Sequence, residues 1–338
     1  MIILYELECM MRLLFVYVLT CLSATLGNVE IFPAKIVEFT LEEGKYYDLQ
    51  ESRDLSRWST FESATLGRGD ALSRAIKINA IEAAYFRANP VEGDWVLVWE
   101  DEFESRAIDR SKWMNDVNAN GGGNKELQYY TDEPENSFIE RGNLVIVALK
   151  ERYTGLDGEK DYTSAKLTTK FRGIWKYGRI DVRARLPIGQ GIWPAIWMLP
   201  QNSEYGKWSA SGEIDIVETL GHEPTTVHGT IHYGGQWPQN QSKTKSVELE
   251  SGTVADDFHT YSVIWDEGKI QWFLDGNLYH EATEWSSSGG AFPAPFDEEF
   301  YLILNVAVGG NWPGNPDLTT LFPVRMEVDY VRVYQRID

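Results

Sequence analysis

The stretch Glu213-Ile214-Asp215-Ile216-Val217-Glu218 determines how this sequence is interpreted. Its acids alternate with β-branched residues, a pattern that predicts a strand with one acidic and one apolar face. Glu213 and Asp215 then point to the same side, whereas Glu218 points to the other side because side chains alternate along a strand. A β-bulge of one extra residue near Ile216 or Val217 would return Glu218 to the side of the other two acids.

With such a bulge, the two glutamates are four strand positions apart, or roughly 13 Å between Cα atoms. Their long side chains can lean toward each other, and a retaining glycosidase needs its two carboxyl groups roughly 5–5.5 Å apart. The spacing therefore suggests a sugar-cleaving pair. A solvated acidic face is the alternative interpretation, because the chain carries 51 Asp and Glu against 31 Lys and Arg.

The composition of the 338 residues indicates a folded protein and narrows its partners. Hydrophobic residues make up 43% of the chain and can fill a substantial core. The 13 Trp and 17 Tyr could stack on sugar rings or fill a β-sandwich core. A net charge of −20 argues against nucleic acid and anionic membranes as partners. A neutral polysaccharide would be indifferent to that charge.

The N-terminus predicts a secretory signal peptide over residues 1–27. Arg12 precedes an apolar run that is too short to span a bilayer, and small residues follow it. A buried N-terminal strand is the alternative. Both cysteines, Cys9 and Cys21, lie inside this leader, so the mature chain would have no disulfide, thiol nucleophile or cysteine metal site. We therefore expect a secreted, extracellular protein.

Residues 28–92 form an N-terminal extension to which the sequence assigns no role. Between Asp70 and Ala88 the apolar residues recur at helical spacing, which predicts a helix. We interpret the extension as a segment packed on the main domain. A small separate domain and a propeptide are the alternatives.

From residue 93 onward the sequence pattern is all-β. Strands are predicted at residues 95–99, 143–147, 179–185, 261–265, 269–274 and 326–334. The strand ending at residue 274 runs into Asp275-Gly276, a typical hairpin turn. Many short strands joined by such turns favour a sandwich or a barrel. No apolar run near the C-terminus could anchor the protein in a membrane.

A set of motifs gives the region from residue 93 to 337 a specific resemblance. Beside the acidic strand, the motifs are GIWPAIWMLP (191–200), GHEP (221–224), VHGTIHY (227–233), DFHTY (257–261), VGGNWPG (308–314) and VDYVRVY (328–334). Together they resemble glycoside hydrolase family 16 in its laminarinase branch. The resemblance does not extend to the N-terminal segment.

The resemblance implies a β-jelly-roll sandwich with a concave substrate cleft and hydrolysis with net retention. Glu213 would be the nucleophile, Glu218 the general acid/base, and Asp215 would orient the nucleophile. Three carboxylates on one strand face repel one another, so at least one pKa should rise. This chemistry requires no cofactor.

The motif also bears on the substrate. The six-residue form with the extra Val217 resembles that of laminarinases, whereas licheninase-type relatives lack the bulge. We therefore expect a monomeric, endo-acting β-1,3-glucanase that cuts laminarin-type glucan. Cleavage of mixed β-1,3-1,4-glucan and transglycosylation are alternatives. A glucan-recognition protein with little turnover is another, although the presence of Glu213 and Glu218 favours an enzyme.

The resemblance implies substrate-binding residues around the acids. Trp193 and Trp208 are expected to stack on glucose rings, with core packing as the alternative for Trp193. His232 is expected to face the cleft, and Trp312 could be a sugar platform or a rim residue. Asn124, in a Gly-rich stretch, is expected to donate to sugar hydroxyls.

Two further predictions rest on the resemblance. Lys166 stands where similar enzymes carry a cleft arginine, so it keeps the charge but loses the planar fork. A structural Ca²⁺ away from the acids would be held by Glu102, the carbonyl of Gly142, and Asp329. A simple surface role for the two acids is the alternative.

Overall fold

The computed structural model describes residues 34–41, 46–52, 59–66, 71–77, 85–90 and 95–336. The chain divides into two compact units, Met1–Asp94 and Trp95–Asp338. The predicted signal peptide lies outside the described residues. Among the described residues, no helix is long and apolar enough to cross a membrane.

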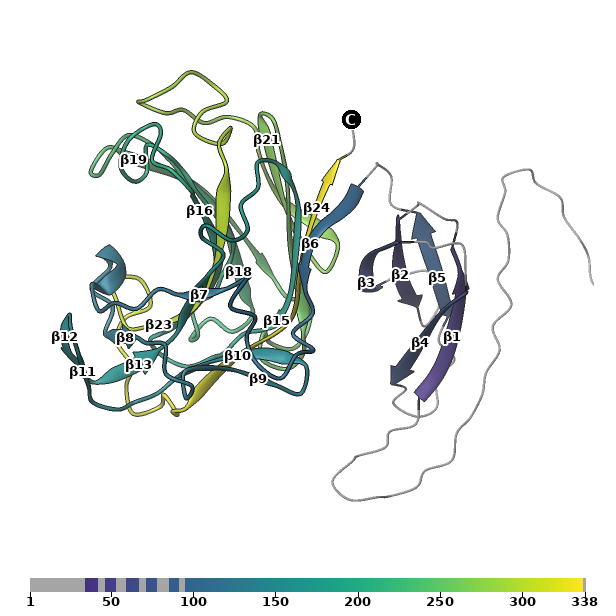
Figure 1. Cartoon of the computed structure of the whole chain (residues 1–338), viewed down its shortest axis with the longest axis horizontal. Coiled ribbons are helices and arrows are strands. Elements are labelled where there is room, and N and C mark those ends of the chain that lie inside the picture. Colours follow the sequence, from purple (N-terminus) through teal and green to yellow (C-terminus); the bar gives the residue numbers. More distant parts are fainter. Residues whose placement is uncertain are drawn as a thin grey trace, which may run out of the picture. The chain divides into compact units, whose positions relative to one another are not determined.

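The described part of the first unit is built from strands in two small antiparallel sheets (Figure 1). These strands are β1 (Ala34–Thr40), β2 (Tyr46–Ser52), β3 (Ser59–Leu66), β4 (Ala71–Lys77) and β5 (Tyr85–Pro90). One sheet pairs β1 with β4, and the other places β2 between β3 and β5. The buried side chains of Phe39, Leu41, Tyr47 and Leu49 form a small core, against which Leu72 packs.

The helix predicted between Asp70 and Ala88 is wrong, because Ala71–Lys77 form strand β4 and the residues from Tyr85 onward belong to strand β5. A few apolar residues over a short segment can satisfy a period of two as well as a period of 3.6. Cross-strand pairing decides between these readings. Leu72 lies directly opposite Phe39 in the ladder between β1 and β4, where both side chains contribute to the small core.

The second unit contains the remaining strands. In chain order they are β6 (Trp95–Asp101), β7 (Met114–Asn115), β8 (Gln128–Tyr130), β9 (Ser137–Glu140), β10 (Asn143–Ala148), β11 (Tyr153–Gly155), β12 (Gly158–Lys160), β13 (Tyr162–Ser164), β14 (Lys166–Thr168), β15 (Gly178–Arg185), β16 (Ile192–Pro200), β17 (Glu213–Glu218), β18 (Thr226–Gly234), β19 (Asn240–Glu248), β20 (His259–Asp266), β21 (Lys269–Leu274), β22 (Asn277–Ala282), β23 (Phe300–Val308) and β24 (Val324–Arg336). A short 3₁₀ helix, η1 (Gly121–Gly123), precedes β8.

Two large antiparallel sheets form a sandwich in this unit (Figure 1). The seven-stranded sheet has the order β19-β18-β17-β16-β23-β14-β7. The eight-stranded sheet has the order β22-β21-β20-β15-β24-β10-β9, and β6 also pairs with β24. The prediction of an all-β jelly-roll sandwich is therefore confirmed.

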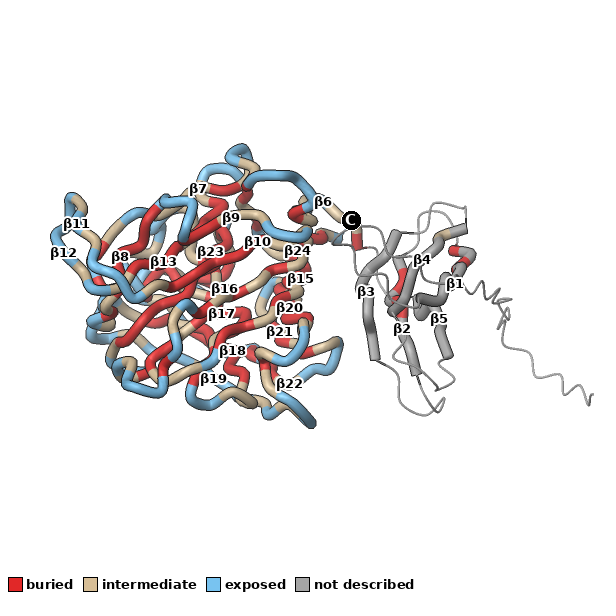
Figure 2. Tube along the Cα trace, turned by 90° about the horizontal axis from the view of Figure 1, so that it is seen from below, coloured by how far each residue is buried: buried red, intermediate tan, exposed pale blue. Residues whose placement is uncertain are grey.

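One continuous hydrophobic core lies between the two sheets. The seven-stranded sheet contributes Ile196, Ile214 and Leu304, among others, and the eight-stranded sheet contributes Val182, Val263 and Val331. Buried residues, drawn red in Figure 2, follow the strands of this unit, while exposed residues gather on its loops. Because one face of each strand is buried here, the opposite face of the seven-stranded sheet is free to carry polar side chains. We call it the acid face, since Glu213, Asp215 and Glu218 lie on it.

Candidate active site

Strand β17 contains the predicted bulge. In its ladder with β18, Asp215 lies opposite Thr230 and Glu218 lies opposite His228, so two residues of β17 face one residue of β18. The register with β16 shifts at the same place. The side chains of both Ile216 and Val217 are fully buried in the core, which returns Glu218 to the acid face.

Two residues that the sequence analysis missed support the bulge from the core side. A bulge disrupts the ladder and leaves backbone groups to be satisfied elsewhere. The indole N–H of Trp272, on β21 of the opposite sheet, donates to the backbone carbonyl of Asp215 at 2.8 Å. Gly229 faces the bulge from β18, and a Cβ there would lie 2.6 Å from Cδ1 of Trp272. A glycine inside a strand marks a close approach of this kind, so the signal was present in the sequence.

Each of the two glutamates accepts a hydrogen bond from a tryptophan. The indole Nε1 of Trp208 donates to Oε2 of Glu213 at 2.8 Å. The indole Nε1 of Trp193 donates to Oε1 of Glu218 at 3.0 Å. Trp193 and Trp208, predicted as sugar-stacking residues, are therefore also hydrogen-bond donors to the acids. Their stacking role stays a prediction.

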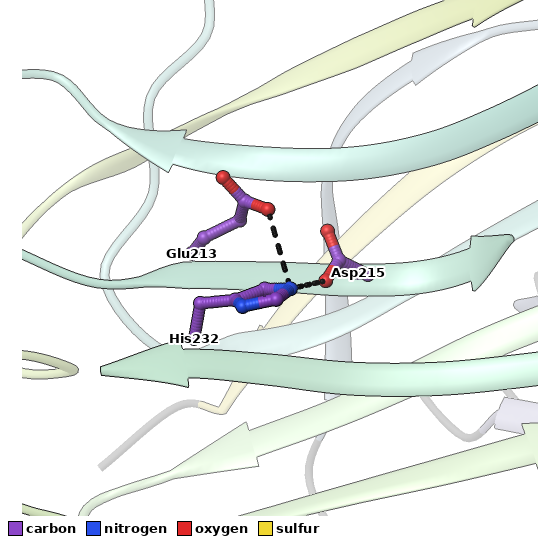
Figure 3. Close-up of side chains that lie close together, drawn as sticks. All are labelled: Glu213, Asp215 and His232. Atoms are coloured by element: carbon purple, nitrogen blue, oxygen red, sulfur yellow. Dashed lines mark ion pairs between the residues drawn. The ribbon is translucent and has the colours of Figure 1, made fainter. Parts of the chain in front are cut away.

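His232, predicted to face the cleft, lies beside these acids, and its contact with substrate stays a prediction. It lies opposite Glu213 in the ladder between β17 and β18. Its Nε2 lies 3.3 Å from Oδ2 of Asp215 and 3.7 Å from Oε1 of Glu213 (Figure 3). Asp215 is 2% exposed, whereas the two glutamates are half-buried. Strand pairing thus gathers three acids and one imidazole on a single patch.

The pKa values of the acids follow from this crowding. Burial and the charge of Asp215 raise the pKa of Glu213 to about 8, against the opposing effects of His232 and Trp208. Burial raises the pKa of Asp215 as well. The pKa of Glu218 is raised by burial and by the charges of both other acids. The ionised form of Glu218 is destabilised by two neighbouring carboxylates, whereas that of Glu213 is destabilised by one. We therefore expect Glu218 to be the last of the acids to lose its proton as the pH rises.

Trp312 and Asn124 lie in two loops that are joined to each other. The Trp312 ring packs edge-on against Trp193 at 5.3 Å between ring centroids, and also against His228. The backbone N–H of Asn311 donates to the carbonyl of Asn124 at 2.8 Å. The side chain of Asn124 donates to the carbonyl of Gly122 within its own loop. The structure thus links Trp312 to the acid cluster through Trp193, while the sugar contacts of both residues stay predictions.

Lys166 lies on the acid face but away from the acids. It pairs with Asn305 across the β14–β23 ladder, so two strands separate it from β17. Its Nζ makes an ion pair with Asp116 at 2.8 Å and lies 5.4 Å from the centre of the Trp197 ring. The ammonium group is therefore held by an acid and an aromatic ring, and its contact with substrate stays a prediction.

The residues predicted to hold calcium are engaged by arginines. Both carboxylate oxygens of Glu102 accept hydrogen bonds from Arg332, at 2.7 and 2.9 Å. The carboxylate of Asp329 is paired with Arg183. Gly142 has φ +76°, in the turn between β9 and β10. These carboxylates are already paired with guanidinium groups, so the arrangement does not fit a calcium site. No bound ion tests the prediction.

The described residues also contain a group that could hold a metal ion. Glu213, Asp215 and His232 each offer a ligand atom, and these atoms all lie within 4.8 Å of one another (Figure 3). The same three side chains form the acid cluster, so a metal bound here would occupy the atoms that the acid chemistry needs.

The comparisons with known proteins agree with this geometry. The sequence profile described as glycosyl hydrolases family 16 matches residues 118–332. The chain belongs to glycosyl hydrolases family 16. It is 44% identical to the catalytic domain of an endo-1,3-beta-glucanase (laminarinase) from Thermotoga petrophila. That structure has a TM-score of 0.66, and the match covers 73% of this chain and 100% of that one.

Two further relatives match similar shares of this chain. The chain is 45% identical to "Glucan endo-1,3-beta-glucosidase A1" of Niallia circulans, over 71% of this chain and 38% of that protein. It is 41% identical to a "Beta-glucanase" of Rhodothermus marinus, over 72% of this chain and 86% of that protein. The chain therefore matches well under half of the length of the Niallia relative. The family resemblance found in the sequence is confirmed.

Proposed function

We propose that this protein is a retaining endo-β-1,3-glucanase that hydrolyses laminarin-type β-glucan. One observation carries the proposal: the bulge in β17 places Glu213, Asp215 and Glu218 on one face of the sheet, within range of one another's charges. The similarity to laminarinases supports the choice of substrate. Hydrolysis of this kind needs two carboxyl groups and water, so the proposal includes no cofactor.

The raised pKa values suggest a role for each acid. Glu218 is expected to keep its proton longest, which suits the group that must protonate the leaving oxygen. Burial and the charge of Asp215 raise the pKa of Glu213 to about 8, while Trp208 and His232 favour its ionised form. Glu213 is therefore the nucleophile when it is ionised and Asp215 holds a proton. Asp215 is buried beside Glu213 and opposite Thr230, where it can hold a proton and orient the nucleophile.

The reaction follows in two balanced steps. In the first, a carboxylate oxygen of Glu213 bonds to the anomeric carbon, the glycosidic bond breaks, and the proton of Glu218 passes to the departing oxygen. In the second, the carboxylate of Glu218 takes a proton from water. The water oxygen then bonds to the anomeric carbon and releases Glu213 as a carboxylate. Both glutamates return to their starting protonation.

The alternatives concern the same site. Mixed-linkage β-1,3-1,4-glucan would need the same acids in the same roles, and so would transglycosylation with a sugar hydroxyl in place of water. A recognition protein with little turnover would need the acid face to bind glucan, but it would not need proton transfer by the glutamates. The hydrogen bonds that hold each glutamate favour an enzyme, since binding alone does not require positioned carboxyl groups.

Release of reducing ends from laminarin and lichenan tests the proposal. The full chain, Glu213→Gln, Glu218→Gln and the exposed control Glu250→Gln are assayed in parallel, together with laminarin binding by calorimetry. We expect faster release from laminarin, a loss of about 10³-fold in kcat for either active-site variant, and unchanged binding. Faster release from lichenan than from laminarin would overturn the assigned β-1,3 preference. Binding of laminarin without release of reducing ends by the unmodified chain would indicate a recognition protein.

We also propose that the protein is secreted. This proposal rests on the leader predicted over residues 1–27. Mass spectrometry of the protein recovered from the culture medium of an expressing cell tests it. A mature N-terminus near residue 28 is expected, and retention of the intact chain inside the cell would contradict the location.

A further inference from the structure

We propose that Trp193 and Trp208 are positioning residues, each fixing one of the two glutamates for its own role in the reaction. This inference rests on the proposed function and assigns the tryptophans a role other than stacking on sugar. The two hydrogen bonds to Glu218 and Glu213 carry it.

The direction of these bonds decides which carboxyl oxygens remain available. An indole N–H can only donate, so the oxygen that receives it must offer a lone pair. On Glu218 that oxygen is Oε1, which leaves Oε2 to carry the transferred proton. On Glu213 the bonded oxygen is Oε2, while Oε1 faces His232. Each tryptophan thus selects one oxygen of its carboxyl group.

The two donors are themselves held in place. Trp193 lies on β16, the strand next to β17, and packs edge-on against Trp312. Trp208 lies in the loop between these strands. The backbone N–H of Trp237 donates to its carbonyl at 3.1 Å, and the hydroxyl of the adjacent Ser209 donates to the carbonyl of Tyr233 at 2.7 Å. Donors fixed in this way can orient a carboxyl group before substrate arrives.

Other groups around the glutamates would remain when a tryptophan is changed. The titratable neighbours are Asp215 on the same strand, His228 and His232 on β18, and Tyr301 on β23. Strand β16 presents no titratable side chain to β17. Loss of one indole donor therefore leaves the charged neighbours in place and removes one hydrogen bond to one glutamate.

The direction of the resulting change differs between the two residues. A donated N–H stabilises the ionised carboxyl, so each bond lowers the pKa of its own glutamate. Without Trp208 the pKa of Glu213 should rise, and the acidic limb of the pH profile should move to higher pH. Without Trp193 the pKa of Glu218 should rise, and the alkaline limb should move to higher pH. A purely structural or stacking role would not separate the two limbs.

The test compares the pH dependence of kcat/KM for Trp193→Phe, Trp208→Phe and Trp197→Phe. Phenylalanine keeps an aromatic ring but has no donor. Trp197 is the matched control, because it lies on the same strand as Trp193 and donates to Asn305 at 2.6 Å instead of to an acid. We expect a shift of roughly one pH unit in the acidic limb for Trp208→Phe and in the alkaline limb for Trp193→Phe. Trp197→Phe should leave both limbs in place.

Two outcomes would overturn the inference. One is a higher KM for either variant with unmoved limbs, which would leave sugar stacking as the role. The other is an equal shift in the control. Titration of the carboxyl carbons by NMR, in protein carrying ¹³C-labelled glutamate, gives the same comparison without turnover. If the unmodified chain cuts no β-glucan, the proposed function fails, while the carboxyl titrations still decide the tryptophan roles.

Discussion

The indole N–H of Trp272 donates a hydrogen bond across the core to the backbone carbonyl of Asp215, at a distance of 2.8 Å. The donor belongs to one sheet of the sandwich and the acceptor to the bulge of the other. Trp272 is fully buried and stacks on His280 at 4.4 Å between ring centroids. The opposite sheet thus supports the irregular backbone that aligns the three acids.

Replacement of Trp272 by phenylalanine tests this support. The change leaves a buried carbonyl without its donor, so we expect a loss of about 1–3 kcal/mol in the free energy of unfolding. We also expect a lower kcat, because the bulge positions both glutamates. Urea unfolding and the rate of laminarin hydrolysis measure the two effects.

Trp265→Phe is the matched control for that variant. The Trp265 indole is equally buried and donates to the carbonyl of Phe296 at 3.0 Å, away from the bulge. The Trp265→Phe substitution should lower the free energy of unfolding by a similar amount and leave kcat unchanged. Equal losses of kcat in both variants would show that the effect comes from general destabilisation.

Gly229→Ala should disturb the same contact from the neighbouring strand. An added Cβ would lie 2.6 Å from Trp272 Cδ1 and 2.5 Å from the hydroxyl of Tyr279, and both rings would have to move. We expect a loss of about 1–3 kcal/mol in the free energy of unfolding. A double-mutant cycle with Trp272→Phe measures how much of that loss arises at Trp272. If the losses of the two single variants simply add up in the double variant, the clash with Trp272 is not the cause.

The acid cluster should make stability fall as pH rises. Burial and the charge of Asp215 raise the pKa of Glu213 from its ordinary 4.5 to about 8. Between these values the folded protein binds more protons than the unfolded chain, so the free energy of unfolding decreases with pH. Glutamine cannot ionise, so Glu213→Gln should raise the melting temperature by about 3 °C at pH 8.

Calorimetry at pH 4.5 and pH 8 measures that effect. The gain from Glu213→Gln should be much smaller at pH 4.5, where the glutamate is protonated in the folded state and about half protonated in the unfolded state. Glu250→Gln, at an exposed position, provides the control. An equal gain at both pH values would mean that the charge of Glu213 is not the cause.

The sequence was most informative where local pattern and burial coincide. Acids interleaved with β-branched residues predicted both strand β17 and its bulge, because only an extra buried residue returns Glu218 to the acid face. Alternation likewise predicted β15, β20 and β21, each of which has one face in the core. Such patterns of alternation can be recognised within a single strand, without knowledge of its partners.

Contacts between distant strands were beyond the reach of the sequence. Trp272 lies 57 positions from Asp215, and its own strand reads only as an alternating core element. The direction of the Trp193 and Trp208 indoles was missed for the same reason, since aromatic residues near acids suggest stacking and hydrogen bonding equally. The helix predicted after Asp70 was wrong because strand partners elsewhere in the chain outweighed local spacing.

The stereochemistry of the first product tests the central claim most directly. If the bulge brings Glu213 and Glu218 together as nucleophile and acid/base, hydrolysis of laminarin proceeds through two displacements at the anomeric carbon. Proton NMR of the earliest product, recorded before the free sugar interconverts, should show the β-anomer of the new reducing end. First appearance of the α-anomer would mean a single displacement by water and would contradict the roles assigned to the two glutamates.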